Sequence, residues 1–264
     1  MTRAVLMVAI VAGLSSPVLA ADRLTDRDVK GLITRIEQGR DKFDDELDGK
    51  LKDSVLRQPT GEVNVKDVLN DFQKSIDRVE ERLNPEYAAS AEVATLLRRA
   101  SGIDAFFRQQ PPGTKGESEW NRLASDLKVL AVAYGADFPL SADATVRRIG
   151  DGELVTAVSQ VAATSDQLKK SLDNDLKKDP TVSKEARQAA IAESEQLTKD
   201  AKALRDRVKD AKPSSAEASK LLAQASKVQG FVASHQVPAS AAAWKATAGH
   251  VQVVATAYGT PWPR

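Results

Sequence analysis

Few residues of this chain combine a reactive side chain with a spacing that supports chemistry, and histidine comes closest. The sequence has two histidines, and His250 lies in a predicted helix one position before its apolar stripe. Helical bundles can hold haem or a metal ion through histidines that face inward. No second histidine or methionine lies at ligand spacing from His250, and the matching residue in the first half is Asp126. We therefore keep His250 as a candidate ligand contact, favour a solvated histidine, and predict no metal and no cofactor.

An acidic run, Asp44-Asp-Glu-Leu-Asp48-Gly49, has the alternating oxygen ligands that open a calcium-binding loop. The twelfth position of such a loop needs a bidentate glutamate, and here it is Val55. The run also lies within an apolar helical pattern. We therefore predict a solvated helix face at this position.

Four aromatic side chains occupy matching positions in two copies of one pattern. Trp120 and Tyr134 bracket the apolar stripe of one predicted helix, and Trp244 and Tyr258 bracket its copy. Aromatic residues of this kind line many small-molecule pockets, so these four are candidate ligand contacts. They also lie on the predicted buried stripe of a helix, and this position favours core anchors.

Charged residues recur at matching positions as well. Asp48 matches Asp173, and Arg82 matches Arg207. A face that binds a partner twice would retain such residues, so these four are candidate partner contacts. Ion pairs on the surface of a helix explain the recurrence almost as well.

The sequence contains no recognised catalytic motif. It lacks a serine elbow, a paired-histidine zinc motif and a phosphate-binding glycine loop, and it has no cysteine. Both methionines, Met1 and Met7, lie within the first twenty residues, so no sulfur ligand follows them. We therefore predict that the protein is not an enzyme. Carboxylate chemistry in a helical core is the least favoured alternative, because apolar residues occupy the positions that its ligands would need.

The balance of charges excludes a further class. The chain has 38 basic and 37 acidic side chains, and it lacks the basic excess of nucleic-acid binders. We predict no nucleic-acid partner. With 42% hydrophobic residues, the chain can bury a core in each of about two domains.

The first twenty residues are typical of a secretory signal peptide. Arg3 precedes an uncharged apolar run over residues 4–14, and the small residues Val18 and Ala20 suit a cleavage site. We predict a signal peptide over residues 1–20, cleaved near Ala20, and a periplasmic or secreted mature protein. The apolar run is too short to span a bilayer and no later stretch is long enough, so we predict no integral membrane span.

The two halves of the chain repeat one another with a shift of 125 residues, which falls to 124 in the last helix. Arg23-Leu24-Thr-Asp26 matches Arg148-Ile149-Gly-Asp151, and Trp120 matches Trp244. The apolar positions of the first helix repeat too: Val29, Ile33, Ile36, Phe43 and Leu47 match Leu154, Val158, Val161, Leu168 and Leu172. A single register held over this distance indicates an internal duplication.

Caps and loop residues divide each half into four helices. Prolines and glycines mark the loops between the apolar stripes. Left-handed glycines are expected to close the last helix of each half, at Gly135 and Gly259. Helix starts are predicted from capping residues at Asn64, Ser118, Ser183 and Ser240, and from a capping box between Ser214 and Glu217.

These patterns predict an all-α fold without strands. Four amphipathic helices with short loops close most simply as an antiparallel, up-down-up-down bundle. We predict a tandem duplication of such a four-helix bundle, over residues 21–140 and 141–264, with eight helices in the mature chain. The halves form either two separate bundles or one continuous eight-helix body, and the sequence leaves this open.

The predicted function is binding. We expect an exported, non-enzymatic binding or structural module whose partner is another protein in the cell envelope or outside the cell. The alternative is a carrier of a non-covalently bound cofactor or apolar ligand, such as haem or a lipid, inside a four-helix bundle. Helical b-type cytochromes work in this manner, and the predicted architecture resembles theirs.

Overall fold

The structure is a computed structural model that describes residues 23–58, 61–180, 182–235 and 237–262. Within these ranges the chain forms nine helices and one two-stranded hairpin, so the predicted all-α class is confirmed. None of these helices combines the length and the apolar character needed to cross a membrane. The predicted signal peptide and its cleavage site lie outside the described residues.

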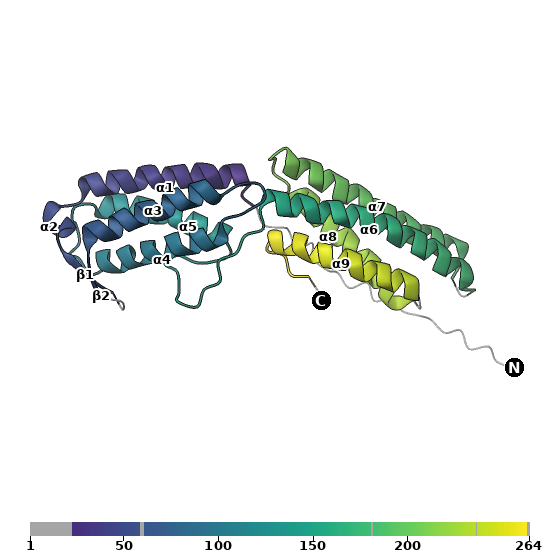
Figure 1. Ribbon diagram of the computed structural model, residues 1–264. Helices are drawn as coiled ribbons and strands as arrows, with labels where there is room; N and C mark the ends of the chain where they lie inside the picture. Colours follow the sequence, from purple (N-terminus) through teal and green to yellow (C-terminus); the bar gives the residue numbers. More distant parts are fainter. Residues whose placement is uncertain (1–22, 59–60, 181, 236, 263–264) are drawn as a thin grey trace.

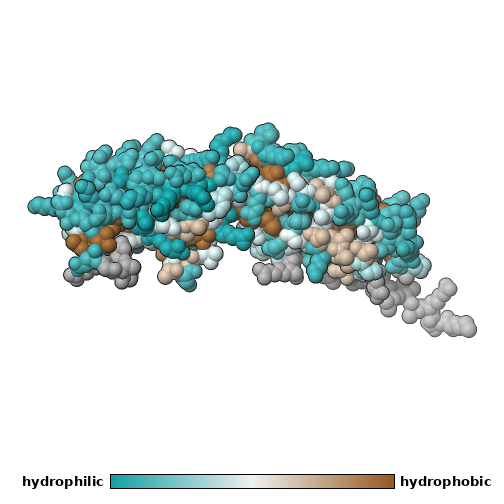
Figure 2. All heavy atoms as spheres, in the orientation of Figure 1, coloured by the Kyte–Doolittle hydropathy of each residue, from teal (hydrophilic) through white to brown (hydrophobic). Residues whose placement is uncertain are grey.

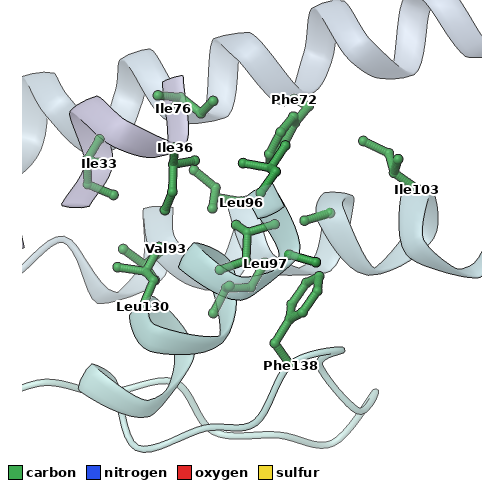
Figure 3. Packing of buried hydrophobic residues seen from close by; sticks show 14 of the residues in the cluster. Ile33, Ile36, Phe72, Ile76, Val93, Leu96, Leu97, Ile103, Leu130 and Phe138 are labelled. Atoms are coloured by element: carbon green, nitrogen blue, oxygen red, sulfur yellow. The ribbon is translucent and has the colours of Figure 1, made fainter. Parts of the chain in front are cut away.

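The first helix group contains five helices and the hairpin (Figure 1). Their bounds are α1 (Asp26–Glu46), α2 (Gly49–Lys52), β1 (Val55–Gln58), β2 (Gly61–Asn64), α3 (Val65–Arg82), α4 (Ser90–Phe107) and α5 (Glu117–Ala133). Helices α1 and α4 each pack against both α3 and α5. One hydrophobic core joins the four long helices, and Figure 3 shows Ile36, Phe72 and Leu97 meeting in it.

The second helix group has the same pattern of neighbours. It consists of α6 (Asp151–Lys178), α7 (Lys184–Lys209), α8 (Ser215–Ser234) and α9 (Pro238–Ala257). Helices α6 and α8 each pack against both α7 and α9 around a second hydrophobic core. The two cores are separate, and the first ends at Phe138 while the second begins at Ile149.

The region after α1 differs from the prediction. The helical pattern was expected to continue through Leu47, but α1 ends at Glu46 because Leu47 is extended (φ −67°, ψ 131°). The side chain of Asp48 then accepts a hydrogen bond from the Lys50 N–H at 2.8 Å and caps α2. Strands β1 and β2 follow, paired from Val55 with Asn64 to Gln58 with Gly61. The described chain therefore has a ninth helix and a short hairpin that the sequence pattern did not predict.

Helix ends follow local signals only where no distant partner competes. Asn64 and Ser183 cap their helices as predicted, and Gly135 and Gly259 adopt left-handed φ values of 68° and 60°. The prediction fails at Ser118, because α5 begins at Glu117 and its N-cap residue is the left-handed Gly116.

Two other predicted caps are replaced by contacts between helices. The main-chain N–H and the hydroxyl of Ser240 both donate to Asp175 Oδ2 at 2.9 Å, and α9 begins earlier, at Pro238. The hydroxyl of Ser214 bonds to Tyr258, and it makes no capping bond. The predicted capping box is therefore wrong, because a partner from a distant helix takes its hydroxyl.

Candidate functional site

Trp120 and Trp244 lie in different cores and share no site. Trp120 is 2% exposed and Trp244 is 7% exposed. The Trp120 indole N–H donates to Asp104 Oδ1 at 3.1 Å, and its ring packs at 5.3 Å from the ring of Phe43. Both side chains therefore occupy the places of core anchors.

The two tyrosines hold equivalent positions at the ends of α5 and α9. The Tyr134 hydroxyl donates to the carbonyl oxygen of Ala88 at 2.7 Å, and the Tyr258 hydroxyl lies 2.7 Å from Ser214 Oγ. Each bond fastens the last helix of its group to the chain just before the third long helix. Burial raises the pKa of Tyr134 to about 12 and also raises the pKa of Tyr258, so both hydroxyls are protonated at neutral pH.

His250 is half-buried on α9. It borders a hollow of about 540 Å³ with Pro85, Gly152 and Thr156. Among the described residues, no group of three His, Asp or Glu side chains is placed to hold a metal ion.

The four candidate partner contacts already have partners within the chain. Arg82 pairs with Glu92 at 3.5 Å, and the equivalent Arg207 pairs with Glu217 at 3.1 Å. Asp48 caps α2, whereas Asp173 lies inside α6 and pairs with Lys177. The arginines thus form the same ion pair in both groups, and the aspartates occupy different local structures.

A set of reciprocal contacts joins the two helix groups where α1 and α6 begin, and Figure 1 shows these two helix starts meeting in the middle of the molecule. We call Arg23, Asp26, Arg148 and Asp151 the clasp. Arg23 pairs with Asp151, and Arg148 pairs with Asp26. The Asp26 N–H donates to Asp151 Oδ2 at 2.8 Å, and the Asp151 N–H donates to Asp26 Oδ2 at 2.9 Å.

Two further bonds complete the set. Arg23 Nη2 donates to the Ile149 carbonyl oxygen at 2.7 Å, and Arg148 Nη2 donates to the Leu24 carbonyl oxygen at 2.8 Å. Exchanging each residue with its partner 125 positions away turns every contact of the clasp into another contact of the clasp. The junction therefore has a local two-fold relationship between matching residues, as in an isologous interface.

The clasp is largely buried, and its two arginines and two aspartates balance one another in charge. None of its four side chains is more than 16% exposed. Each carboxylate lies at the N-terminus of the other group's first helix, where the helix dipole favours negative charge. The Arg148 guanidinium also lies 5.9 Å from the centre of the Tyr134 ring. The junction thus satisfies its buried charges within itself.

A groove of about 530 Å³ runs along the junction beside the clasp. Most of its lining consists of matching residues from the two groups: Arg23 and Arg148, Leu24 and Ile149, Val132 and Thr256, Ala133 and Ala257, and Gly135 and Gly259. The groove therefore lies on the local two-fold axis. Figure 2 shows apolar atoms at the surface where the groups meet, within a largely hydrophilic face.

The groove has an apolar wall and a cationic edge. Val129 and Val132 of α5 are 46% and 69% exposed, although they line the groove. Lys128 and Arg147 add positive charge, and no carboxylate among the described residues lines the groove. Of the predicted ligand contacts, only Tyr258 borders this groove; Trp120, Tyr134, Trp244 and His250 do not.

Sequence reasoning missed the groove. The repeated Arg23-Leu24-Thr-Asp26 signal was visible, but it indicated a duplication and not that the copies bind each other. No family model matches the chain, and no curated protein or solved structure matches it. The geometry of the junction is therefore the basis for assigning a function.

Proposed function

We propose that this chain is an exported, non-enzymatic binding protein made of two copies of an antiparallel four-helix bundle, with its binding site in the groove between the copies. Three observations support the duplication: the 125-residue register, the identical pattern of helix neighbours, and the reciprocal clasp. The groove carries the functional part of the proposal.

The groove is suited to binding because it combines size, exposed apolar surface and a few polar groups. Its volume of about 530 Å³ falls within the range of small-molecule sites. Val129 and Val132 are exposed, and a ligand that covers them removes apolar surface from water, which favours binding. The clasp fixes both walls, so a ligand meets a preformed surface.

The lining favours binding over catalysis. Its charged groups are arginine and lysine, and no carboxylate or histidine of the described residues lines it to act as a general base. We place the ligand at the junction and not inside a bundle, because Trp120 and Trp244 are packed into separate apolar cores.

The binding site is tested by native mass spectrometry of the mature protein purified from its own host. We expect a retained ligand or partner that is lost in Val132→Asp, because the new carboxylate lies on the apolar wall of the groove. Val55→Asp is the matched control, because Val55 is also exposed and lies on the hairpin at the far end of the first helix group (Figure 1). Equal retention by both variants, or no bound species in the wild type, would refute the proposed site.

The export part of the proposal has a separate test. We expect the protein in the periplasmic or culture fraction, with an N-terminus at Ala21. Edman sequencing of the mature protein measures this directly, and an intact N-terminus in the cytoplasmic fraction would contradict export.

A further inference from the structure

We infer that the ligand of the groove is a single-chain anionic amphiphile, of the fatty-acid carboxylate type. This inference rests on the proposed function, since it names the chemistry of the same site. The anionic head would lie at Lys128 and Arg147, and the hydrocarbon chain would cover Val129 and Val132. The charges, the apolar wall and the asymmetry of the groove each support this chemistry.

The positive charges that line the groove favour an anionic ligand. Four cationic side chains line it, and two of them, Arg23 and Arg148, are neutralised in the clasp. The Arg147 side chain is 70% exposed, and its guanidinium lies 3.8 Å from the Glu153 carboxylate. Lys128 has no ion pair within the described part of the chain. The Lys128 ammonium is therefore available to an anionic ligand, whereas the Arg147 guanidinium shares its charge with Glu153.

The apolar wall lies next to this charge on the same helix. Val129 directly follows Lys128, and Val132 lies three positions further, so the two valines share one face of α5. Ala133 and Ala257 extend the apolar lining to both helix groups. A hydrocarbon chain is the simplest occupant that covers such a wall and offers it no polar group.

The groove is symmetric in backbone but one-sided in chemistry. On α9, the residues that match Lys128 and Val132 are Gln252 and Thr256, which are uncharged and polar. Lys128 and the exposed Val132 of α5 therefore have no like counterparts at the matching positions of α9. A ligand with one charged end and one apolar end matches this arrangement, whereas a two-fold symmetric ligand would need both walls alike.

The size of the groove favours a small molecule over a protein segment. About 530 Å³ is within the range of small-molecule pockets. An acidic amphipathic peptide is the competing occupant and serves as an arm of the test.

The experiment is isothermal titration calorimetry of the delipidated mature protein with dodecanoate below its critical micelle concentration. We expect one dodecanoate per chain, weaker binding at high salt, and no binding of dodecyltrimethylammonium, which has the same chain and the opposite charge. We expect Lys128→Glu and Arg147→Glu each to weaken binding about tenfold, as for loss of a charge-assisted hydrogen bond. Val132→Asp should abolish binding, and Val55→Asp should leave it unchanged.

Circular dichroism of every variant checks that the helices remain folded, which the exposure of all four side chains favours. Equal binding of both amphiphiles, or several dodecanoates per chain, would reveal detergent-like adsorption and overturn the inference. Binding of an acidic peptide but not dodecanoate, lost in Val132→Asp, would overturn the lipid assignment and leave the proposed binding site standing. Absence of any groove-dependent binding in the native protein would overturn both the lipid assignment and the proposed binding site.

Discussion

Asp26 and Asp151 cap each other's helices across the junction. The main-chain N–H of each residue donates to a side-chain oxygen of the other, at 2.8 and 2.9 Å. The same two carboxylates neutralise Arg148 and Arg23. Because each carboxylate binds both the first helix start and the arginine of the opposite group, the two helix groups are fixed to each other at one point by matched charges.

Removing one carboxylate of the clasp is expected to destabilise the whole chain. Asp26→Ala leaves Arg148 buried without its counter-ion. Breaking such a buried pair lowers the free energy of unfolding by about 3–5 kcal/mol. Urea denaturation measures the change in the free energy of unfolding. Asp210→Ala is the control, because Asp210 pairs with Lys212 at the exposed surface and its removal should have little effect. Equal stability of the two variants would show that the clasp does not hold the groups together.

The two tryptophans should differ in their contribution to stability. Replacement of Trp120 or Trp244 by alanine leaves a cavity in its core and lowers the free energy of unfolding by about 3–5 kcal/mol. We expect Trp120→Ala to lie at the upper end, since it also removes the hydrogen bond to Asp104 and the packing on Phe43. Trp244 has Leu168 at the place that matches Phe43. Thermal unfolding of both variants tests the order, and an unchanged midpoint for Trp244→Ala would refute its role in the core.

A methyl group at Gly152 should disrupt the junction. A Cβ atom there would clash with the carbonyl oxygen of Pro85, in the loop between α3 and α4. We expect Gly152→Ala to cost about 1–3 kcal/mol, as for an overpacked contact. Gly249→Ala is the control, since Gly249 has open space around it. Alanine is more favourable than glycine inside a helix by up to about 1 kcal/mol, so this variant should be more stable. Differential scanning calorimetry should give opposite shifts, and a stabilised Gly152→Ala would contradict the contact.

Burial of Tyr134 predicts a loss of stability at alkaline pH. Its folded-state pKa is raised to about 12, above its ordinary value of 10.0, because burial disfavours the phenolate. Between these values the unfolded chain releases a proton that the folded chain keeps, so the free energy of unfolding falls as the pH rises. The contribution is complete below pH 10 and is lost as the pH approaches 12.

Tyr134→Phe removes this titration and should flatten the decline. The variant should also be less stable by about 1 kcal/mol at neutral pH, because the carbonyl of Ala88 loses its donor. Urea denaturation of both proteins between pH 8 and pH 12 measures the two effects. Parallel pH profiles would show that Tyr134 is not the responsible group.

Much of the helical architecture was predictable, because apolar residues recur with the period of a helix. Val29, Ile33 and Ile36 were predicted to share a face, and all three are buried in the first core. The hairpin was not predictable, since its four-residue strands are too short for alternation to stand out. Ser214 failed as a cap because Tyr258, far away in sequence, supplies a better partner.

The candidate site was predictable only in part. The aromatic stripes were correctly expected to suit the core, but they drew attention to the bundles and away from the junction. The groove depends on α5 of one group and α9 of the other lying beside the same clasp. No local pattern around Val132 distinguishes a groove wall from an ordinary exposed position.

The sequence by itself determined the helices, their buried faces and the register that relates Arg23 to Arg148 and Asp26 to Asp151. Periodicity and capping act over a few residues, so a linear chain displays them. Only the tertiary structure decided that each arginine pairs with the aspartate of the opposite helix group, and that a groove opens beside them. Such contacts join residues more than a hundred positions apart, and their energy depends on distance and burial, which exist only once the chain has folded.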